Sequence, residues 1–171
     1  IKKILNLKPK KICFADIDDN MDKERALVVF KLLNKNAIVV NDINLHYVWK
    51  KKFSKRYFSN YLKNNQKLNY RNILNSNFIG FTNSAVRFEV LKQNKNKILI
   101  NKKIRVYDWF LWSILTIKNN AIFTNRTVTQ YNIFKNSKNK IPPSKYFKSI
   151  YNLIVVKKNH YDLMSSEKKV Y

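Results

Sequence analysis

Hydrophobic positions divide the first forty residues into two short apolar runs with an amphipathic segment between them. The runs are residues 11–15, which end in the acidic stretch 16–20, and residues 37–40. Between them, residues 22–34 place apolar side chains at the three- and four-residue spacing of one helix face, namely Ala26, Leu27, Val29, Phe30 and Leu33. A strand, an acidic loop, a helix and a strand in this order are typical of a βαβ unit. We therefore expect the two strands to pair in parallel, the second ending at Asn41-Asp42.

The pattern loosens after residue 46 and then becomes regular again. Residues 46–71 are basic and aromatic without a clear period, which predicts an exposed, partly helical excursion. Residues 77–82 have strand character and hold the only glycine, Gly80, where we expect a positive φ or a close backbone approach. The remaining pattern predicts helices at 85–91, 107–117 and 146–164, a polar connection at 92–103, and strands at 121–124 and 127–133.

The composition is that of a folded and strongly basic domain. The 171 residues include 35 Lys+Arg and 10 Asp+Glu, a formal net charge of +25, and 45% are hydrophobic. A single glycine excludes the Gly-rich phosphate-binding loops. The lone Cys13 cannot form an internal disulfide, and His46 and His160 lack the spacing of a zinc site. Because an AT-rich coding sequence also produces many Lys and Asn codons, the charge alone is weak support for nucleic-acid binding.

No membrane-spanning or secretory segment is expected from the sequence. The longest nearly apolar run, residues 109–117, has about half of the ~20 residues that a membrane-spanning helix needs. The N-terminus shows no signal-peptide pattern. Residue 1 is Ile. We expect this chain to be a piece of a longer protein.

The acidic residues are concentrated in one place. Five of the ten, Asp16, Asp18, Asp19, Asp22 and Glu24, lie within nine positions at the end of the first predicted strand. Crowded carboxylates raise each other's pKa unless a cation or backbone amides neutralise them. Mg²⁺ and Mn²⁺ take such oxygen ligands, typically one or two carboxylates together with substrate phosphates. The alternative is that these residues end the strand and cap the following helix, and the cluster by itself favours neither interpretation.

Four motifs in order resemble one enzyme family. They are Phe14-Ala-Asp-Ile-Asp-Asp19 with the following helix and Ile38-Val-Val-Asn-Asp42, then Asn77-Phe-Ile-Gly-Phe-Thr-Asn83, then Tyr107-Asp-Trp109 opening an apolar helix, and finally Ala121-Ile-Phe-Thr124 with Thr129-Gln-Tyr131. Together they resemble family 2 glycosyltransferases of the GT-A fold over residues 11–139. The closing segment Tyr131-Asn-Ile-Phe134 lacks the Arg and His that the family often carries there, and the family's N-terminal half has no counterpart in this chain.

The resemblance implies an α/β fold, a partial GT-A domain, Rossmann-like, without its N-terminal strands. Residues 1–140 would form the C-terminal portion of the nucleotide-diphospho-sugar transferase domain, and 141–171 a helical tail. Because the nucleotide-binding half is absent, we do not expect the isolated chain to be active. The resemblance also implies a cytoplasmic enzyme of bacterial polysaccharide biosynthesis, with peripheral membrane contact.

The resemblance further assigns roles to six residues. Asp16 and Asp18 would form the DxD motif and hold Mg²⁺ or Mn²⁺, beside a nucleotide-sugar donor. Asp108 would be the general base of an inverting transfer to a glycan or lipid-linked acceptor, or else a helix-terminal residue favoured by the helix dipole. The expected substrate contacts are Asp19, Asn83 and Trp109, although an aromatic in an apolar helix is more often part of the core.

Two other functions compete with this one. A haloacid-dehalogenase-type phosphatase also begins with an apolar strand and Asp-x-Asp, but residue 20 is Asn where Thr or Val is usual, and no later acidic pair completes a magnesium site. A basic nucleic-acid-binding module without catalysis would explain the charge and leave the acidic cluster unexplained. The basic stretch 50–71 could attract an anionic acceptor or lipid headgroups, or simply form a solvated face.

Overall fold

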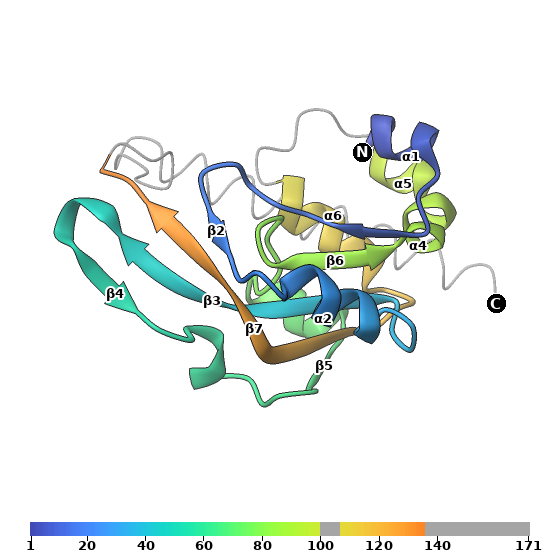
Figure 1. The fold of residues 1–171 in the computed structure, drawn as a ribbon. Helices are drawn as coiled ribbons and strands as arrows, with labels where there is room; N and C mark the ends of the chain where they lie inside the picture. Colours follow the sequence, from blue (N-terminus) through green and yellow to red (C-terminus); the bar gives the residue numbers. More distant parts are fainter. Residues whose placement is uncertain (100–106, 136–171) are drawn as a thin grey trace, which may run out of the picture.

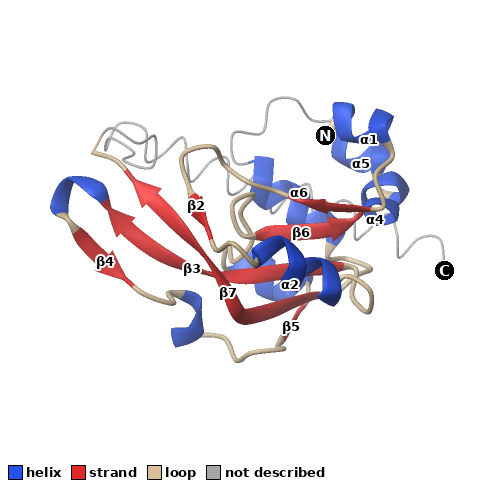
Figure 2. Cartoon of the chain, viewed as in Figure 1, coloured by secondary structure: helices blue, strands red, loops and turns tan. Residues whose placement is uncertain are grey.

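The computed structural model describes residues 1–99 and 107–135, which form a mixed sheet with helices on both faces (Figures 1 and 2). In these residues the sheet has seven strands in the order β1-β6-β3-β7-β2, with β4 also paired to β3 and β5 to β7. The strands are β1 (Lys11–Cys13), β2 (Asn20–Met21), β3 (Ile38–Tyr47), β4 (Lys52–Ser54), β5 (Lys67–Leu68), β6 (Ser84–Arg87) and β7 (Ala121–Ile133). The helices are α1 (Lys2–Leu7), α2 (Arg25–Leu32), α3 (Tyr70–Asn75), α4 (Phe88–Gln93), α5 (Lys95–Leu99) and α6 (Tyr107–Leu115), with 3₁₀ turns η1 (Val48–Lys50) and η2 (Phe58–Asn60).

The predicted direct parallel pairing of the first two strands is wrong. β6 lies between β1 and β3 and is antiparallel to both, with Val86 opposite Ile12 on one side and Ile38 on the other. The parallel partner of β3 is β7. The hydrophobic pattern reports which residues of a strand are buried, and it does not report which later strand enters between two earlier ones.

The third and seventh strands are longer than the pattern predicts. β3 continues past the expected end at Asn41-Asp42 to Tyr47, and the two strands expected at 121–124 and 127–133 form the single strand β7. The register shifts at this point, because Asn41 pairs with Thr124 while Asp42 pairs with Val128. β7 bends sharply along its length (Figure 1). Such an irregularity bends a strand without ending its pairing.

Two apolar clusters hold the helices on the sheet. On one face α2 packs Val29 and Leu33 against Val39, Ala85 and Ile122. On the other face the larger cluster joins α3, α4, α5 and α6 to the sheet, with Trp112 and Phe123 among its fully buried side chains. The predicted helices at 22–34 and 107–117 are thus confirmed. Leu27, which we placed on the apolar face, is 71% exposed.

The segment around Gly80 differs from the prediction. Residues 77–83 form a loop, the strand begins at Ser84, and the expected helix is divided into β6 and α4. Gly80 has no positive φ, and a Cβ placed on it would lie 3.5 Å from the Asn83 side-chain oxygen, an ordinary contact. Both reasons that we gave for this glycine are therefore wrong.

The excursion at 46–71 is largely exposed and contains short helical turns, as predicted, but it also holds β4 and β5. α1 was not predicted. The predicted helix at 146–164, the boundary at 140 and the end of the polar connection lie outside the described residues. Among the helices of the described ranges, none combines the length and apolar character needed to cross a bilayer.

Candidate functional site

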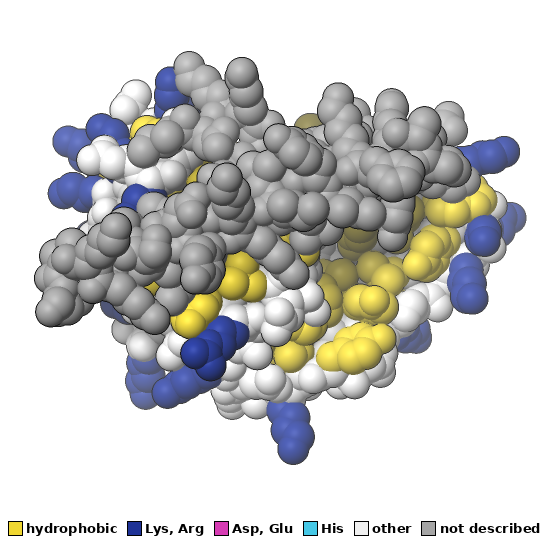
Figure 3. Space-filling model, turned by 180° about the vertical axis from the view of Figure 1, so that it is seen from behind, with side chains coloured by type: hydrophobic (Ala, Val, Ile, Leu, Met, Phe, Trp, Pro, Cys, Tyr) yellow, Lys and Arg dark blue, Asp and Glu magenta, His cyan; other side chains and the backbone are white. Residues whose placement is uncertain are grey.

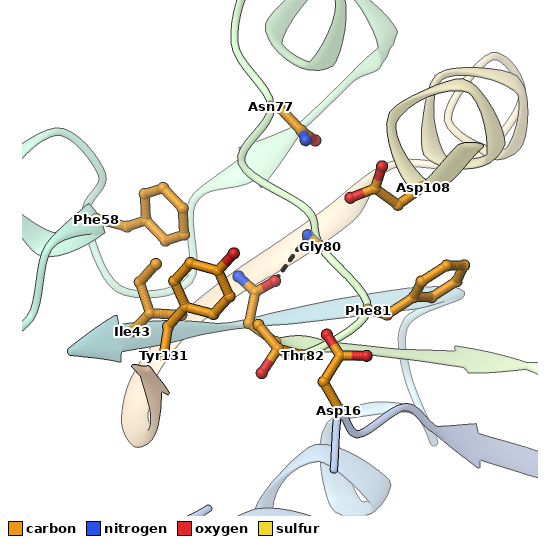
Figure 4. Close-up of a pocket in the computed structure, with 10 residues that line it drawn as sticks. Asp16, Ile43, Phe58, Asn77, Gly80, Phe81, Thr82, Asp108 and Tyr131 are labelled. Carbon is orange, nitrogen blue, oxygen red and sulfur yellow. Dashed lines mark hydrogen bonds between the residues drawn. The ribbon is translucent and has the colours of Figure 1, made fainter. Parts of the chain in front are cut away.

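A pocket of about 210 Å³ brings together residues from distant parts of the sequence (Figure 4). Asp16 comes from the loop after β1, Ile43 from β3, Asp108 from the start of α6 and Tyr131 from β7. The rest of the lining is Phe58 together with Asn77, Gly80, Phe81, Thr82 and Asn83 of the 77–83 loop. In Figure 4, Asp108 and Asn77 point into the pocket from one side, and Asp16 and Tyr131 from the other. The loop that follows β1 and the first turn of α6 therefore share one site.

Asp108 is a half-buried carboxylate in the first turn of α6. It accepts a hydrogen bond from the Trp109 backbone N–H at 2.8 Å and another from the Asn77 side chain. Burial raises the pKa of Asp108 above its ordinary value, and the hydrogen bonds only partly oppose this. A carboxylate with a raised pKa holds a proton more strongly than an ordinary one. Asp108 is thus better suited to accept a proton than a solvent-exposed aspartate.

Asp16 faces the same pocket and is also half-buried. Its pKa is raised first by burial and then by the negative charges of Asp19, Asp18 and Asp108. The influence of Asp108 on Asp16 indicates that the two carboxylates are close enough to interact through the pocket. The pocket therefore concentrates negative charge.

The acidic loop is held in place by polar contacts to β7 and to the 77–83 loop. The Thr82 hydroxyl donates to one carboxylate oxygen of Asp19, and the Asn132 backbone N–H donates to the other at 2.9 Å. The Asn132 side-chain amide donates to the Asp18 carbonyl oxygen at 2.7 Å. Both Asp19 oxygens are thus engaged within the protein, and Asp19, predicted to contact the substrate, positions the loop. Asp18 is exposed at the edge of the site.

Two other predicted substrate contacts are committed to the protein itself. Asn83 lines the pocket, but it donates to the carbonyl oxygens of Asn41 at 3.0 Å and Phe78 at 3.1 Å and accepts from the Gly80 N–H at 2.8 Å. It therefore shapes the 77–83 loop. Trp109 is not among the lining residues, and its indole N–H donates to the Ile73 carbonyl oxygen at 2.5 Å. This placement does not support sugar stacking by Trp109.

Arg25, which the sequence did not single out, lies buried beneath the acidic loop with 2% of its surface exposed. It donates to the Asn41 side-chain oxygen at 2.7 Å and to the carbonyl oxygens of Phe14 at 2.9 Å and Ser84 at 3.3 Å. Burial lowers its pKa. Arg25 therefore connects the ends of β1, β3 and β6 next to the pocket.

The carboxylates fit a divalent ion that also binds a phosphate-bearing substrate. The described residues contain no group of three or more His, Cys, Asp or Glu side chains that could hold a metal by themselves. Mg²⁺ usually takes one or two protein carboxylates and completes its ligands with water and substrate phosphates. Asp16, surrounded by like charges, is the carboxylate best placed to gain from such an ion.

Sequence reasoning missed the supporting residues of this site. Asn77, Thr82 and Tyr131 lie in the quoted motifs but received no role, and Asn132 was noted only as part of a departure from the family. Asn77 is the first residue of its motif, and its amide reaches Asp108. An Asn directly after a helix was the one available signal.

Comparisons with known proteins add no assignment to this geometry. No family model matches the chain, and a search of curated proteins finds no match either.

Proposed function

We propose that this chain is part of a glycosyltransferase that transfers a sugar from a nucleotide-sugar donor to an acceptor hydroxyl. The observation that supports the proposal best is that Asp16 and Asp108, from separate motifs of the sequence, face one pocket and influence each other's charge. One carboxylate beside a diphosphate and another beside an acceptor hydroxyl are what an inverting transfer requires. A partial GT-A fold is the finer form of this proposal, and the mixed sheet is compatible with it.

Asp108 acts as the general base in this proposal. As the acceptor hydroxyl attacks the sugar, it must lose a proton, and a carboxylate within hydrogen-bond reach can accept it. The raised pKa of Asp108 brings this carboxylate closer to the operating pH, where general-base catalysis is most efficient. Asn77 and the Trp109 N–H hold the carboxylate in place.

Asp16 acts on the donor side, with Asp18 at the rim of the pocket as the second carboxylate. A Mg²⁺ or Mn²⁺ ion bound by Asp16 and Asp18 would supply positive charge that stabilises the departing diphosphate. Asp19 contributes indirectly, since its bonds to Thr82 and Asn132 fix the loop that carries both residues.

Release of nucleoside diphosphate tests the proposal. The protein as its reading frame encodes it is incubated with a panel of nucleotide sugars and Mn²⁺ or Mg²⁺, with and without EDTA. Asp108→Asn should lower kcat by about 10²- to 10⁴-fold, because it removes the base, and leave donor binding in place. Asp16→Asn should instead weaken metal-dependent donor binding.

Asp22→Asn is the matched control. Asp22 lies in the same acidic segment, but it is exposed and accepts hydrogen bonds from the Glu24 N–H and the Thr127 hydroxyl outside the pocket. It should bind donor and turn over normally. Unchanged donor binding in Asp16→Asn, together with normal turnover in Asp108→Asn, would overturn the proposal. Phosphate release from a phosphomonoester in place of donor cleavage would point to the phosphatase.

A further inference from the structure

A second hollow, the hairpin groove, lies on the β3–β4 hairpin and has a volume of about 410 Å³. Its lining is aromatic and basic: Leu45, Tyr47, Lys50, Lys52, Ser54 and Tyr57. The hairpin extends from the body of the sheet (Figure 1). Nothing in the proposed reaction uses these residues so far.

Strand register explains why these side chains meet. In the β3–β4 pair, Tyr47 lies opposite Lys52 and Leu45 lies opposite Ser54. Directly opposite residues place their side chains on the same face of a sheet. The register thus puts Lys52 beside the Tyr47 ring and the Ser54 hydroxyl beside Leu45.

The hairpin groove and the Asp16–Asp108 pocket lie on the same face. Ile43, Leu45 and Tyr47 alternate along β3 and so point to one face, and Ile43 lines the pocket while the other two line the groove. Tyr131 of the pocket pairs with Leu45 of the groove. Phe58 of the pocket and Tyr57 of the groove have ring centroids 5.4 Å apart. At about 3.3 Å per residue, Tyr47 lies roughly 13 Å along β3 from Ile43.

The charge of the hairpin groove selects anions. The sequence from Ile43 to Phe58 contains no acidic residue and contributes Lys50, Lys52 and three further basic side chains. Lys50 also places its ammonium 6.0 Å from the centre of the Trp49 ring. An ammonium group binds carboxylate or phosphate oxygens through charge-assisted hydrogen bonds.

The aromatic wall of the groove offers flat apolar surface with polar edges. The pKa of Tyr57 is raised by burial and then by the neighbouring Tyr61 and Tyr47, so its hydroxyl stays neutral and can donate a hydrogen bond. Tyrosine combines an apolar ring with a hydrogen-bonding group, which suits a ligand that has both kinds of surface. A sugar ring with an acidic group is such a ligand.

We propose that the hairpin groove binds an anionic sugar unit of the acceptor, one that carries a phosphate or a carboxylate, while the reacting hydroxyl lies in the Asp16–Asp108 pocket. The position of the reacting hydroxyl rests on the proposed function. The anionic sugar site itself rests on the groove and is tested by binding alone.

Calorimetric titration of the protein tests the site with four probes. Glucose 6-phosphate carries a phosphate, trigalacturonic acid carries carboxylates, maltotriose is neutral, and inorganic phosphate lacks the sugar. One or both acidic sugars should bind at least tenfold more tightly than maltotriose and inorganic phosphate, and the stronger of the two identifies the acidic group. Equal affinity for maltotriose and the acidic sugars would overturn the proposal.

Lys50→Gln/Lys52→Gln should weaken binding of the acidic sugar at least tenfold, and so should Tyr47→Ala. Lys23→Gln/Lys31→Gln is the matched control, because it changes the net charge equally on the exposed side of α2, across the sheet. Its affinity should equal that of the unmodified protein. An equal loss in both double variants would show general electrostatics and overturn the site. Thermal melting of each variant checks its folding.

Two further arms separate the proposal from its neighbours. Asp108→Asn should bind the acidic sugar normally, so absence of turnover with intact groove binding would reject the proposed reaction and keep the site. Vesicles with 30% phosphatidylglycerol test a membrane role. Binding to vesicles that requires Lys50 and Lys52, without binding of either acidic sugar, would overturn the proposal in favour of a lipid surface.

Discussion

Asp108 shows how one position can combine a structural cost with chemical use. The carboxylate sits in the first turn of α6, where the helix dipole favours negative charge. Burial nevertheless raises its pKa, so the dipole and the hydrogen bonds do not fully compensate for lost hydration. Asp42, the other buried aspartate, has a different role: it accepts hydrogen bonds from the backbone N–H groups of Ile43 at 2.8 Å and Phe58 at 2.9 Å. Asp42 anchors η2 to β3 and does not line the pocket.

The raised pKa of Asp108 predicts a pH-dependent effect on stability. A carboxyl whose folded pKa is raised binds its proton more tightly in the native state, so the native state loses stability as the pH rises from about 3.8 through the folded pKa. Asp108→Asn removes this ionisation. The variant should therefore be most favourable relative to the unmodified protein near pH 7, and the difference should shrink as the pH falls below 3.8.

Urea unfolding at several pH values measures this dependence. Asp22→Asn serves as the control, because Asp22 is exposed. A stability difference for Asp108→Asn that grows as the pH falls would contradict the prediction, since it would mean that ionised Asp108 stabilises the fold.

At the scale of elements, the site depends on strand ends that are held together from beneath. β1 and β3 are separated by β6, and Arg25 at the start of α2 reaches all three through Phe14, Asn41 and Ser84. The same strand ends carry the acidic loop and the 77–83 loop. A guanidinium with several donors in a fixed geometry can make these bonds at once, which an ammonium group cannot.

Arg25→Met should lower the free energy of unfolding by about 3 kcal/mol or more, because it leaves buried acceptors without donors and removes hydrogen bonds from a charged group. Arg126→Met is the matched control at an exposed position of β7, with an expected change within about 0.5 kcal/mol. Urea unfolding measures both. A loss at Arg25 no larger than that at Arg126 would show that the buried bonds contribute little.

For the whole molecule, the dominant physical property is its net charge of +25. On the face drawn in Figure 3, Lys and Arg side chains surround hydrophobic ones, and no Asp or Glu is visible among the described side chains. Like charges repel one another in a compact state and so lower its stability. The carboxylates of the pocket thus lie in a strongly positive molecule, which attracts anionic substrates.

Added salt should therefore stabilise the protein. Raising NaCl from 20 to 500 mM reduces the Debye length from roughly 20 Å to about 4 Å and screens the repulsion. The urea midpoint should rise with an unchanged m-value. Lys50→Gln/Lys52→Gln should show a smaller rise, because it carries two fewer positive charges. A midpoint that falls with salt would show that attractive ion pairs outweigh the repulsion.

The sequence by itself determined the local elements and the candidate chemistry. β1, α2, the start of β3 and α6 follow from hydrophobic spacing, because burial on one face imposes a period on the chain. The same pattern identified Asp16 and Asp108 as separate candidates. Residues 77–91 were misassigned, since a short apolar run does not distinguish a buried loop from a strand.

Only the tertiary structure decided which elements are neighbours. The insertion of β6 between β1 and β3, the joining of two predicted strands in β7 and the shared pocket of Asp16 and Asp108 all depend on contacts between residues far apart in the chain. The same holds for Arg25, whose partners lie on three strands, and for the hairpin groove, which exists because register places Lys52 beside Tyr47. Periodicity records whether a side chain is buried, and long-range pairing determines what it is buried against.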